Sequence, residues 1–521
     1  MSDQASVGMP AARLAPTVRP LVLGGVVAAG GAGSLATEIC ASRLLAPYFG
    51  SSTVVWANVI GLILVYLSVG YWVGGRVADR HATPRALGRI MLAAALCIAA
   101  LPFVAHPVLR LALDGFERVE VGAVAGSFFA TLALFSVPVT LLGMVSPFAL
   151  RLALTDVARA GETSGRLSAL ATLGAIAGTF APGLLLIPAI GTQRTMILAA
   201  LVVAAASALL LERPALLAVL AIGALLAIPP GAVKPLAGAV DERETAYGYA
   251  QVIRFDDGRT VMRLDEGVAD QSVYRPGVAL TGGEWDMPLV APPLLGRPLR
   301  TALVIGNAGG TTARALAATY PGVRIDGVEL DPALTDLARS WFALDAIPGL
   351  TTHTGDGRVF LETTDARWDL IVVDAYQQAY IPFHLVTREF FSLVRDHLTP
   401  GGAVALNVAR TPGDDDLPRA VSQTLATVLP QVRVWPALRF NELVLGLETP
   451  LTPLETADRL RSAPSAIRSL VPLFAAATTA APADDPMTDD RAPVEWLTDR
   501  ALVDYITRGG RFDEQLLPTA P

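Results

Sequence analysis

The sequence predicts a multi-domain protein: an N-terminal all-α bundle of transmembrane helices, followed by a doubly wound α/β domain of the Rossmann type. Three observations support this prediction. Of the 521 residues, 52% are hydrophobic and only 17% are charged, whereas soluble globular proteins carry about 25% charged residues. Residues 21–230 contain long runs without charges. From Asp241 onward the composition is that of a soluble protein, and from about residue 297 strand and helix patterns alternate around glycine-rich turns.

The composition excludes several classes of function. The net charge is −7 and there is no basic run, so nothing indicates nucleic-acid binding. The two cysteines, Cys40 and Cys97, form no CxxC pair, and the five histidines form no HExxH motif. We therefore expect no metal site. The first apolar stretch is long enough to span a bilayer and no cleavage signal accompanies it, so we expect an anchor rather than a removed signal peptide.

The N-terminal half contains six apolar stretches that reach the roughly 20 residues needed to cross a bilayer. They cover residues 21–46, 54–75, 88–109, 122–147, 166–190 and 193–211. A seventh stretch, 214–230, is short and ends in two prolines, so the predicted transmembrane domain at 21–232 has six or seven helices.

Arginines concentrate in the loops after the second and fourth stretches. The positive-inside rule therefore places these loops and the N-terminal tail, residues 1–20, in the cytoplasm. Six crossings would leave the C-terminal half in the cytoplasm as well, so we expect either that residues 214–230 are re-entrant or interfacial, or that one of the earlier stretches does not cross. The predicted location is the plasma membrane, as a multi-pass protein.

Two features of this half suggest more than an anchor. Glu38 and Arg43 lie in the first stretch, and ionisable groups at membrane depth usually face a partner or a cavity. The loop at residues 74–80, Gly-Gly-Arg-Val-Ala-Asp-Arg, resembles the signature loop between the second and third helices of major-facilitator transporters. Its Asp and Arg residues could pair across the cytoplasmic face.

Five strands are predicted in the second half, with turns and helices between them. They cover residues 299–305, 323–330, 350–353, 370–374 and 402–408, with a helix at 312–319 and a turn at 399–401. A further helix begins at Asp331-Pro332, because Asp is a good N-cap and Pro suits the first helical position. In doubly wound sheets, ligands bind at the carboxyl ends of the strands.

Glycines or acids follow four of these strands in turn. Gly306 and Gly310 allow the backbone to approach a ligand closely. Glu329 ends the second strand, where a carboxylate can accept both ribose hydroxyls. In Gly355-Asp356-Gly357, Asp356 could accept from an adenine amino group, and Asp374 faces the reacting centre. The turn after the first strand reads G-x-A-x-G rather than G-x-G-x-x-G, which favours an adenosyl-sulfonium ligand over NAD.

The sequence resembles the membrane-fused bacterial relatives of the spermidine synthase family, the polyamine aminopropyltransferases. The similar segments are residues 38–52, 244–252, 264–267 with Gln271-Ser272, 304–311, 328–331, 355–357, 373–376 and 488–495. The resemblance implies a small β-hairpin domain at 241–290, an S-adenosylmethionine methyltransferase-like catalytic domain at 291–460 and a helical tail at 461–521. It also makes a homodimer plausible.

The resemblance further implies aminopropyl transfer from decarboxylated S-adenosylmethionine to a polyamine amine. Gln251 and Gln271 would line the donor's chain, and Asp374 would hold the donor's amino group or deprotonate the attacking amine. The remaining donor-binding residues are Gly306, Gly310, Glu329 for the ribose, Asp331, Asp356 for the adenine, and Gly357. A protonated amine is not a nucleophile, so a carboxylate within hydrogen-bond reach would take its proton as it attacks.

Two acids that the family usually carries are absent here. Asn307-Ala308 stands where one is expected in the glycine-rich turn, and Gln377 stands where another is expected after Asp374. Two other functions therefore stay open. One is a methyltransferase that uses S-adenosylmethionine on a membrane-associated acceptor. The other is a transporter-like protein whose soluble domain senses a nucleotide or polyamine. The identity of the acceptor is not determined.

Overall fold

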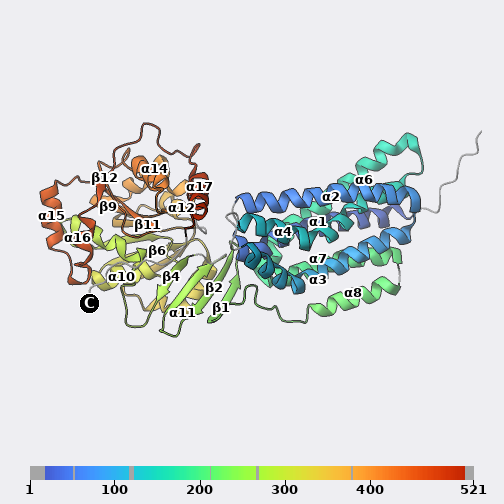
Figure 1. The fold of residues 1–521 in the computed structure, drawn as a ribbon, viewed down its shortest axis with the longest axis horizontal. Coiled ribbons are helices and arrows are strands. Elements are labelled where there is room, and N and C mark those ends of the chain that lie inside the picture. The colour runs from blue at the N-terminus through green and yellow to red at the C-terminus, as the bar shows by residue number, and fades with distance from the viewer. Residues whose placement is uncertain are drawn as a thin grey trace, which may run out of the picture. The chain divides into compact units, whose positions relative to one another are not determined.

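The computed structural model describes residues 18–50, 53–116, 122–211, 213–265, 269–376 and 380–510. Gln377, and Glu266-Gly267 of the predicted hairpin motif, lie outside these ranges. The chain divides into two compact units, Met1–Lys234 and Pro235–Pro521, and each is described by itself (Figure 1).

The first unit is a helical bundle. Its elements are α1 (Pro20–Phe49), α2 (Thr53–His81), α3 (Pro84–Phe116), α4 (Gly122–Gly143), α5 (Val145–Ala153), α6 (Ala160–Phe180), a π-helical segment η2 (Ala181–Leu186), α7 (Ile187–Leu211) and α8 (Arg213–Leu225). Glycines let the helices pack closely: a Cβ added at Gly174 of α6 would lie 1.9 Å from the carbonyl oxygen of Ala28 in α1. Large apolar side chains such as Leu64 and Trp72 remain exposed on the outside.

Within the described residues, five helical segments are long and apolar enough to cross a membrane. The predicted separation between 166–190 and 193–211 is confirmed, because the 52-residue apolar stretch from Ala160 to Leu211 consists of two helices that meet at Gly191. At about 1.5 Å per residue, its residues suffice for two crossings of the ~30 Å bilayer core. It is interrupted at Gly191, whose backbone is not helical (φ 81°, ψ 166°). The stretch at 214–230 forms only the 13-residue α8, which is too short to span.

The loop at 74–80 is largely the end of a helix, since α2 continues to His81. Asp79 near this end forms an ion pair of 3.4 Å with Arg151 of α5. Both side chains are exposed, so the pair adds little to stability.

The second unit contains two sheets. The smaller one is antiparallel, in the order β1 (Ala239–Glu244), β2 (Tyr249–Arg254), β3 (Thr260–Leu264) and β4 (Asp270–Tyr274). The larger one has eight strands in the order β12-β10-β11-β9-β8-β5-β6-β7. Its parallel strands are β5 (Thr301–Ile305), β6 (Arg324–Glu329), β7 (Leu350–Thr354), β8 (Trp368–Val373) and β9 (Leu398–Ala409). The antiparallel strands are β10 (Gln431–Trp435), β11 (Asn441–Leu447) and β12 (Thr478–Thr479).

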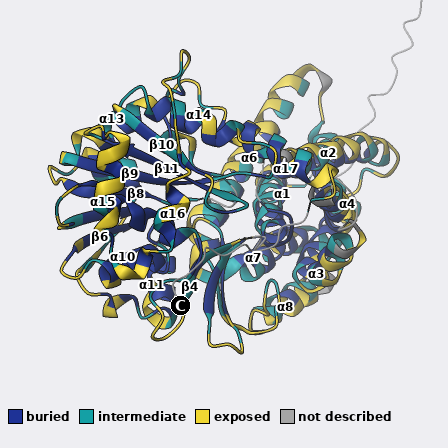
Figure 2. Cartoon of the chain, turned by 60° about the vertical axis from the view of Figure 1, so that its left-hand side comes forward, coloured by how far each residue is buried: buried dark blue, intermediate teal, exposed yellow. Residues whose placement is uncertain are grey.

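Helices cover both faces of the large sheet. They include α10 (Thr311–Thr319), α11 (Pro332–Trp341), α12 (Gly357–Glu362), α13 (Arg388–Asp396), α14 (Asp416–Leu425) and α17 (Val494–Thr507). Alternate residues of the central strands enter two separate cores: Leu370 and Val372 lie in one, Ile371 and Val373 in the other. Figure 2 shows these strands buried beneath the partly exposed helices. Apolar burial on both faces explains why β8 is a continuous hydrophobic run.

Two predicted boundaries in this unit were wrong. The turn at 399–401 lies inside β9, which begins at Leu398 and steps from Leu398 to Ala403 while its partner β8 advances from Trp368 to Leu370. The strand thus bulges around its Pro-Gly-Gly. The segment 461–521 is not only a helical tail, because β12 pairs with the edge strand β10. Backbone pairing with a distant strand leaves no periodic signal in a two-residue segment.

The strand order fixes the position of the ligand edge. The chain builds β5, β6 and β7 outward, then returns to place β8 on the other side of β5. At such a reversal the connections leave in opposite directions and open a crevice at the carboxyl ends of the strands. Gly306 follows β5 and Asp374 follows β8, so both lie at this crevice.

Candidate active site

A cavity of about 790 Å³ opens at the carboxyl ends of β5, β6 and β8, with the small sheet forming part of its wall. Seven of the nine predicted site residues line it: Gln271, Gly306, Glu329, Asp331, Asp356, Gly357 and Asp374. Gln251 and Gly310 do not. Gln251 is buried within the small sheet, where its amide nitrogen lies 3.4 Å from a carboxylate oxygen of Glu242. The strand alternation turns it away from the cavity, which adjacent Ala250 lines instead.

The predicted glycines act through backbone shape. Gly306 has φ +86°, and a Cβ there would lie 2.3 Å from the carbonyl oxygen of Asp374. Gly310 has φ +76° and begins α10, packed against Leu344. A Cβ on Gly357 would lie 2.2 Å from Ile305. The glycine-rich turn can therefore sit directly against the neighbouring strand end, as a tight nucleotide-binding turn requires.

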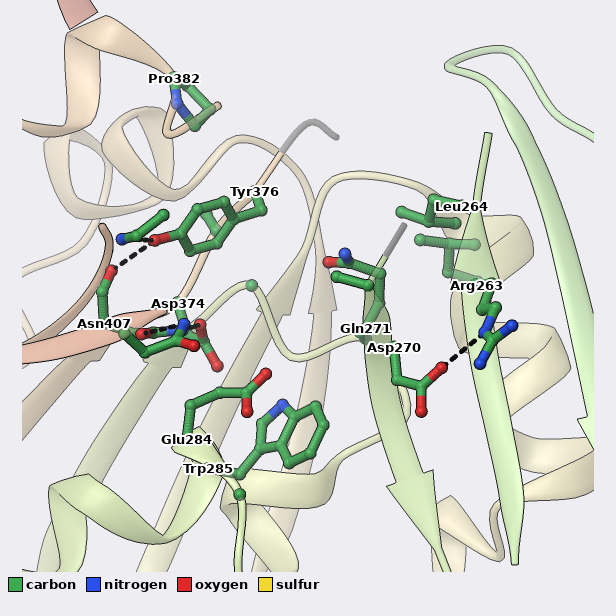
Figure 3. A pocket seen from close by; sticks show the side chains of 18 of the residues that line it. Arg263, Leu264, Asp270, Gln271, Glu284, Trp285, Asp374, Tyr376, Pro382 and Asn407 are labelled. Atoms are coloured by element: carbon green, nitrogen blue, oxygen red, sulfur yellow. Dashed lines mark hydrogen bonds and ion pairs between the residues drawn. The ribbon is translucent and has the colours of Figure 1, made fainter. Parts of the chain in front are cut away.

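The small sheet is tied to this turn by two side chains. The backbone N–H of Gly309 donates to the Ser272 hydroxyl at 2.8 Å. The Thr311 hydroxyl accepts from the N–H of Val273 at 3.0 Å and donates to its carbonyl at 3.1 Å. These bonds hold Gln271, the neighbour of Ser272, at the cavity wall (Figure 3).

Glu329 is buried at the end of β6, only 9% exposed. Its carboxylate accepts from the N–H of Ala308 at 2.9 Å and from that of Asp331 at 3.1 Å. Burial raises its pKa, and the two amide bonds oppose that rise. The N–H of Leu330 acts on the same carboxylate. A carboxylate has about four acceptor positions, so Glu329 keeps capacity for a ligand hydroxyl.

Two predicted acids are also helix caps. The Asp331 side chain accepts from the N–H of Ala333 at the start of α11. Asp356 accepts from Arg358 and Val359 at the start of α12, and its other oxygen lies 2.9 Å from Nε2 of His384. Burial would raise the Asp356 pKa, but His384 and the two amides outweigh it and hold that pKa below its usual value. Asp356 is therefore ionised and hydrogen-bonded to the start of α12, and His384 lies beside it at the cavity wall.

Asp374 is held by a short chain of amides. Asn407 Nδ2 donates to Asp374 Oδ1 at 2.9 Å, and Asn441 Nδ2 donates to Asn407 Oδ1 at 3.0 Å. The second bond fixes which end of the Asn407 amide faces the carboxylate. Asp374 keeps some accessible surface only because it lines the cavity. Burial raises its pKa to about 6, against the lowering effect of Asn407. Such a carboxylate is a stronger base than an exposed aspartate.

The comparisons with known proteins concern the same part of the chain. The family model "Spermine/spermidine synthase domain" matches residues 287–437, which include Glu329, Asp356, Asp374 and Asn407. The chain carries a spermine/spermidine synthase domain.

Among relatives, a probable polyamine aminopropyl transferase of Bifidobacterium longum is 37% identical over 215 residues, covering 40% of this chain and 47% of that protein. A polyamine aminopropyltransferase of Vibrio vulnificus is 29% identical over 209 residues, or 40% of this chain and 66% of that protein. Putrescine N-methyltransferase 2 of Nicotiana attenuata is 30% identical over 164 residues, or 30% and 42%. The chain thus spans about half to two thirds of the first two relatives.

The synthase domain and its neighbouring segments place further groups in the cavity that the sequence did not single out. They are Glu284, Trp285, Tyr376, His384, Asn407 and Asn441. Figure 3 shows Glu284 and Trp285 beside Asp374. The Tyr376 hydroxyl donates to the Asn407 carbonyl at 3.0 Å and accepts from the N–H of Ala409 at 2.8 Å. Of these six residues, Tyr376 alone lies in a sequence segment, 373–376, that the resemblance had pointed to.

The synthase domain lacks an acid in its glycine-rich turn. Asn307 is 5% exposed and packs against Gly327 of β6, outside the cavity, whereas Ala308 lines it. Within the described ranges, no group of three or more His, Cys, Asp or Glu residues could hold a metal ion.

Proposed function

We propose that this chain is a membrane-anchored aminopropyltransferase, which moves an aminopropyl group from decarboxylated S-adenosylmethionine to an amine of a polyamine. The observation that carries the proposal is the oriented, high-pKa carboxylate of Asp374 in the cavity of a spermine/spermidine synthase domain. The names of the relatives in Bifidobacterium longum and Vibrio vulnificus support it.

The cavity residues fit an adenosyl donor. Glu329 offers buried acceptor positions for ribose hydroxyls, and Asp356 with His384 lies at the next strand end, where the base would be. Gly306 lets the backbone approach the ligand. When bound, the sulfonium donor supplies a carbon activated toward attack by a nitrogen lone pair.

The protein's part in the reaction is to receive a proton and to hold cations. An amine with a pKa near 10 is protonated at neutral pH. Asp374 would accept one ammonium proton as the nitrogen bonds to the carbon beside the sulfonium. The carbon–sulfur bond breaks, its electron pair stays on sulfur as a neutral thioether, and the charges balance. Asn407 and Asn441 keep the accepting oxygen in place.

Glu284 would supply a second carboxylate for the cationic amines. It comes from the 3-10 helix η3 (Glu284–Val290) and lines the cavity near Asp374 (Figure 3). A carboxylate there could replace the acid missing at Asn307-Ala308 in attracting the cationic amine, because this attraction depends on where the charge lies and not on which element carries it.

Methyl transfer from S-adenosylmethionine is the second candidate. Two observations favour it: the uncharged Asn307-Ala308 turn, and the similarity to a plant protein named putrescine N-methyltransferase 2. That relative's name concerns an amine acceptor too, so Asp374 would have the same proton-accepting role.

The first unit would serve as a multi-pass anchor in the plasma membrane, with the second unit in the cytoplasm. Of the five apolar segments, the one at Ala160–Leu211 is broken at Gly191 and has residues for two crossings, so six crossings and the arginine-rich loops support this. We include a homodimer in the proposal, to be checked by light scattering in detergent.

The test is a product assay with the full chain in detergent. The protein is incubated with a polyamine mixture and either decarboxylated or intact S-adenosylmethionine, and mass spectrometry identifies the products. An aminopropyl-extended amine that Asp374→Asn abolishes is expected. A methylated amine would move the assignment to the second candidate. If neither product forms, transfer is excluded and nucleotide sensing is left.

A further inference from the structure

One segment outside the matched domain reaches back to the nucleoside end of the cavity. It is the C-terminal strap, residues 487–491, which follows residues 287–437 by some distance in the chain. Both Arg358 NH groups donate to the two oxygens of Asp489, each at 2.7 Å. The Thr387 hydroxyl donates to the same carboxylate at 2.7 Å. Asp489 is thus a three-bond anchor between two segments that are distant in sequence.

Both segments carry a cavity residue. Arg358 is in the first turn of α12, and its N–H donates to the Asp356 carboxylate. Thr387 caps α13 and follows His384 by three residues. The Asp356 and His384 side chains are 2.9 Å apart, and Arg358 also donates to the His384 carbonyl at 3.3 Å. Asp489 therefore connects the start of α12, which carries Asp356, to the segment before α13, which carries His384.

The strap itself is fixed along its length. The Met487 carbonyl accepts from the N–H of Arg388 at 2.9 Å, and the Met487 N–H donates to the Thr424 hydroxyl at 3.0 Å. Met487 is 5% exposed. The N–H of Asp489 donates to Glu389 at 3.2 Å. These hydrogen bonds hold the strap in one position against α13 and α14, whereas most surface loops are mobile.

Arg358 and Asp489 form an ion pair at the nucleoside end of the cavity. Hydrogen bonds from Arg358 hold the Asp489 pKa below its usual value, and those bonds raise the Arg358 pKa. A bidentate pair of this kind is stronger and more directional than a simple surface contact, because a planar fork fixes orientation as well as distance. The Arg358 side chain is 20% exposed and that of Asp489 is 41% exposed, so the pair lies at the surface and its fork geometry, more than burial, fixes the two segments.

We propose that Asp489 is a positioning residue for nucleoside binding: through Arg358 and Thr387 it holds the Asp356–His384 pair in the geometry that receives the base of the donor. The inference rests on the proposed function only in that the cavity binds an adenosyl nucleotide. It holds for aminopropyl and methyl transfer alike.

The test measures binding of 5′-deoxy-5′-methylthioadenosine to the full chain in detergent by titration calorimetry. This probe contains the base and ribose but no amino chain. We expect Asp489→Asn to weaken its Kd about tenfold, and Arg358→Lys, which keeps the charge but loses the fork, to weaken it less. Asp485→Asn is the matched control, since Asp485 lies just before the strap and pairs with exposed Arg491.

The readings separate the possibilities. A purely structural role would lower the number of binding sites per chain and leave the Kd of the folded fraction unchanged, which would overturn the proposal. Equal Kd values for Asp489→Asn and Asp485→Asn would also overturn it, even if wild type makes an aminopropyl product. Weakened binding in a chain that makes no such product would support it and refute the proposed transfer. If Asp489→Asn does not fold, the Kd of Arg358→Lys decides.

Discussion

Strand β8 has an aspartate near each end, and the two carboxylates have opposite properties. Asp369 near the start is 3% exposed, yet its pKa lies below the usual value. Burial opposes that shift, but Arg297, Thr399 and the N–H groups of Arg300 and Thr301 outweigh it. Asp374 just past the end is more accessible, yet burial raises its pKa to about 6 because the single bond from Asn407 opposes it weakly.

The comparison shows that partners, and not exposure, decide what an acid can do. Asp369 has its acceptor positions filled and ties β8 to the start of β5 and to β9. Asp374 has been left short of partners at the edge where ligands bind. A carboxylate with a raised pKa in a cavity is a candidate functional group, so the contrast supports the proposed role of the carboxyl end of the sheet.

Replacing Asp374 should give the largest effect on activity. We expect Asp374→Asn to lower kcat about 10³-fold, because a positioned general base contributes about 10²- to 10⁴-fold. Its raised pKa means that the stability it contributes is full below pH 4 and is lost as the pH rises through about 6. The variant should therefore keep or raise the Tm at pH 7.5. An unchanged kcat would refute the assignment of Asp374 as the base.

Replacing Asp369 should do the reverse. Asp369→Asn breaks the ion pair with Arg297, which is one-third exposed, so we expect a loss of about 2 kcal/mol in the free energy of unfolding. Because the Asp369 pKa is lowered, this contribution is present above the unfolded pKa near 4 and disappears as the pH falls below it. Urea unfolding at pH 7.5 and pH 3.5 measures it. If the folded Asp369→Asn variant lost as much kcat as Asp374→Asn, Asp369 would not be a purely structural residue.

A smaller effect is expected at Glu284. We expect Glu284→Gln to raise the KM of the polyamine about tenfold, since one charge-assisted hydrogen bond to the acceptor is weakened. The Kd of methylthioadenosine should not change. The matched control is Glu162→Gln on α6, which pairs with exposed Arg159 in the first unit. If Glu284→Gln changed only the Kd of methylthioadenosine, Glu284 would belong to the nucleoside site and not to the polyamine site.

The smallest effect concerns the pH profile. Wild-type kcat/KM should fall below pH 6 as Asp374 becomes protonated. Asn407→Leu removes the bond that lowers this pKa, so the acidic limb should move to higher pH. Asn441→Ala should move it in the same direction but less, because Asn441 acts through Asn407. A limb that stays in place would show that another group controls the profile.

Much of the fold could be predicted because its causes are local. Alternating strand and helix patterns placed β5 to β8 within a few residues, and the cap at Asp331 and the positive φ of Gly306 follow from the chemistry of those residues. Glu329, Asp356 and Asp374 reach one cavity because parallel strands end at one edge.

The sequence by itself therefore determined the two classes of region and the strand-end residues, since both depend on neighbours a few positions apart. Only the tertiary structure decided that Gln251 faces away from the cavity and that Asn407 orients Asp374. It also decided that Asp489 meets Arg358 across 131 residues. Such contacts depend on how sheets and helices pack, and pairing between distant residues leaves no period in a single sequence.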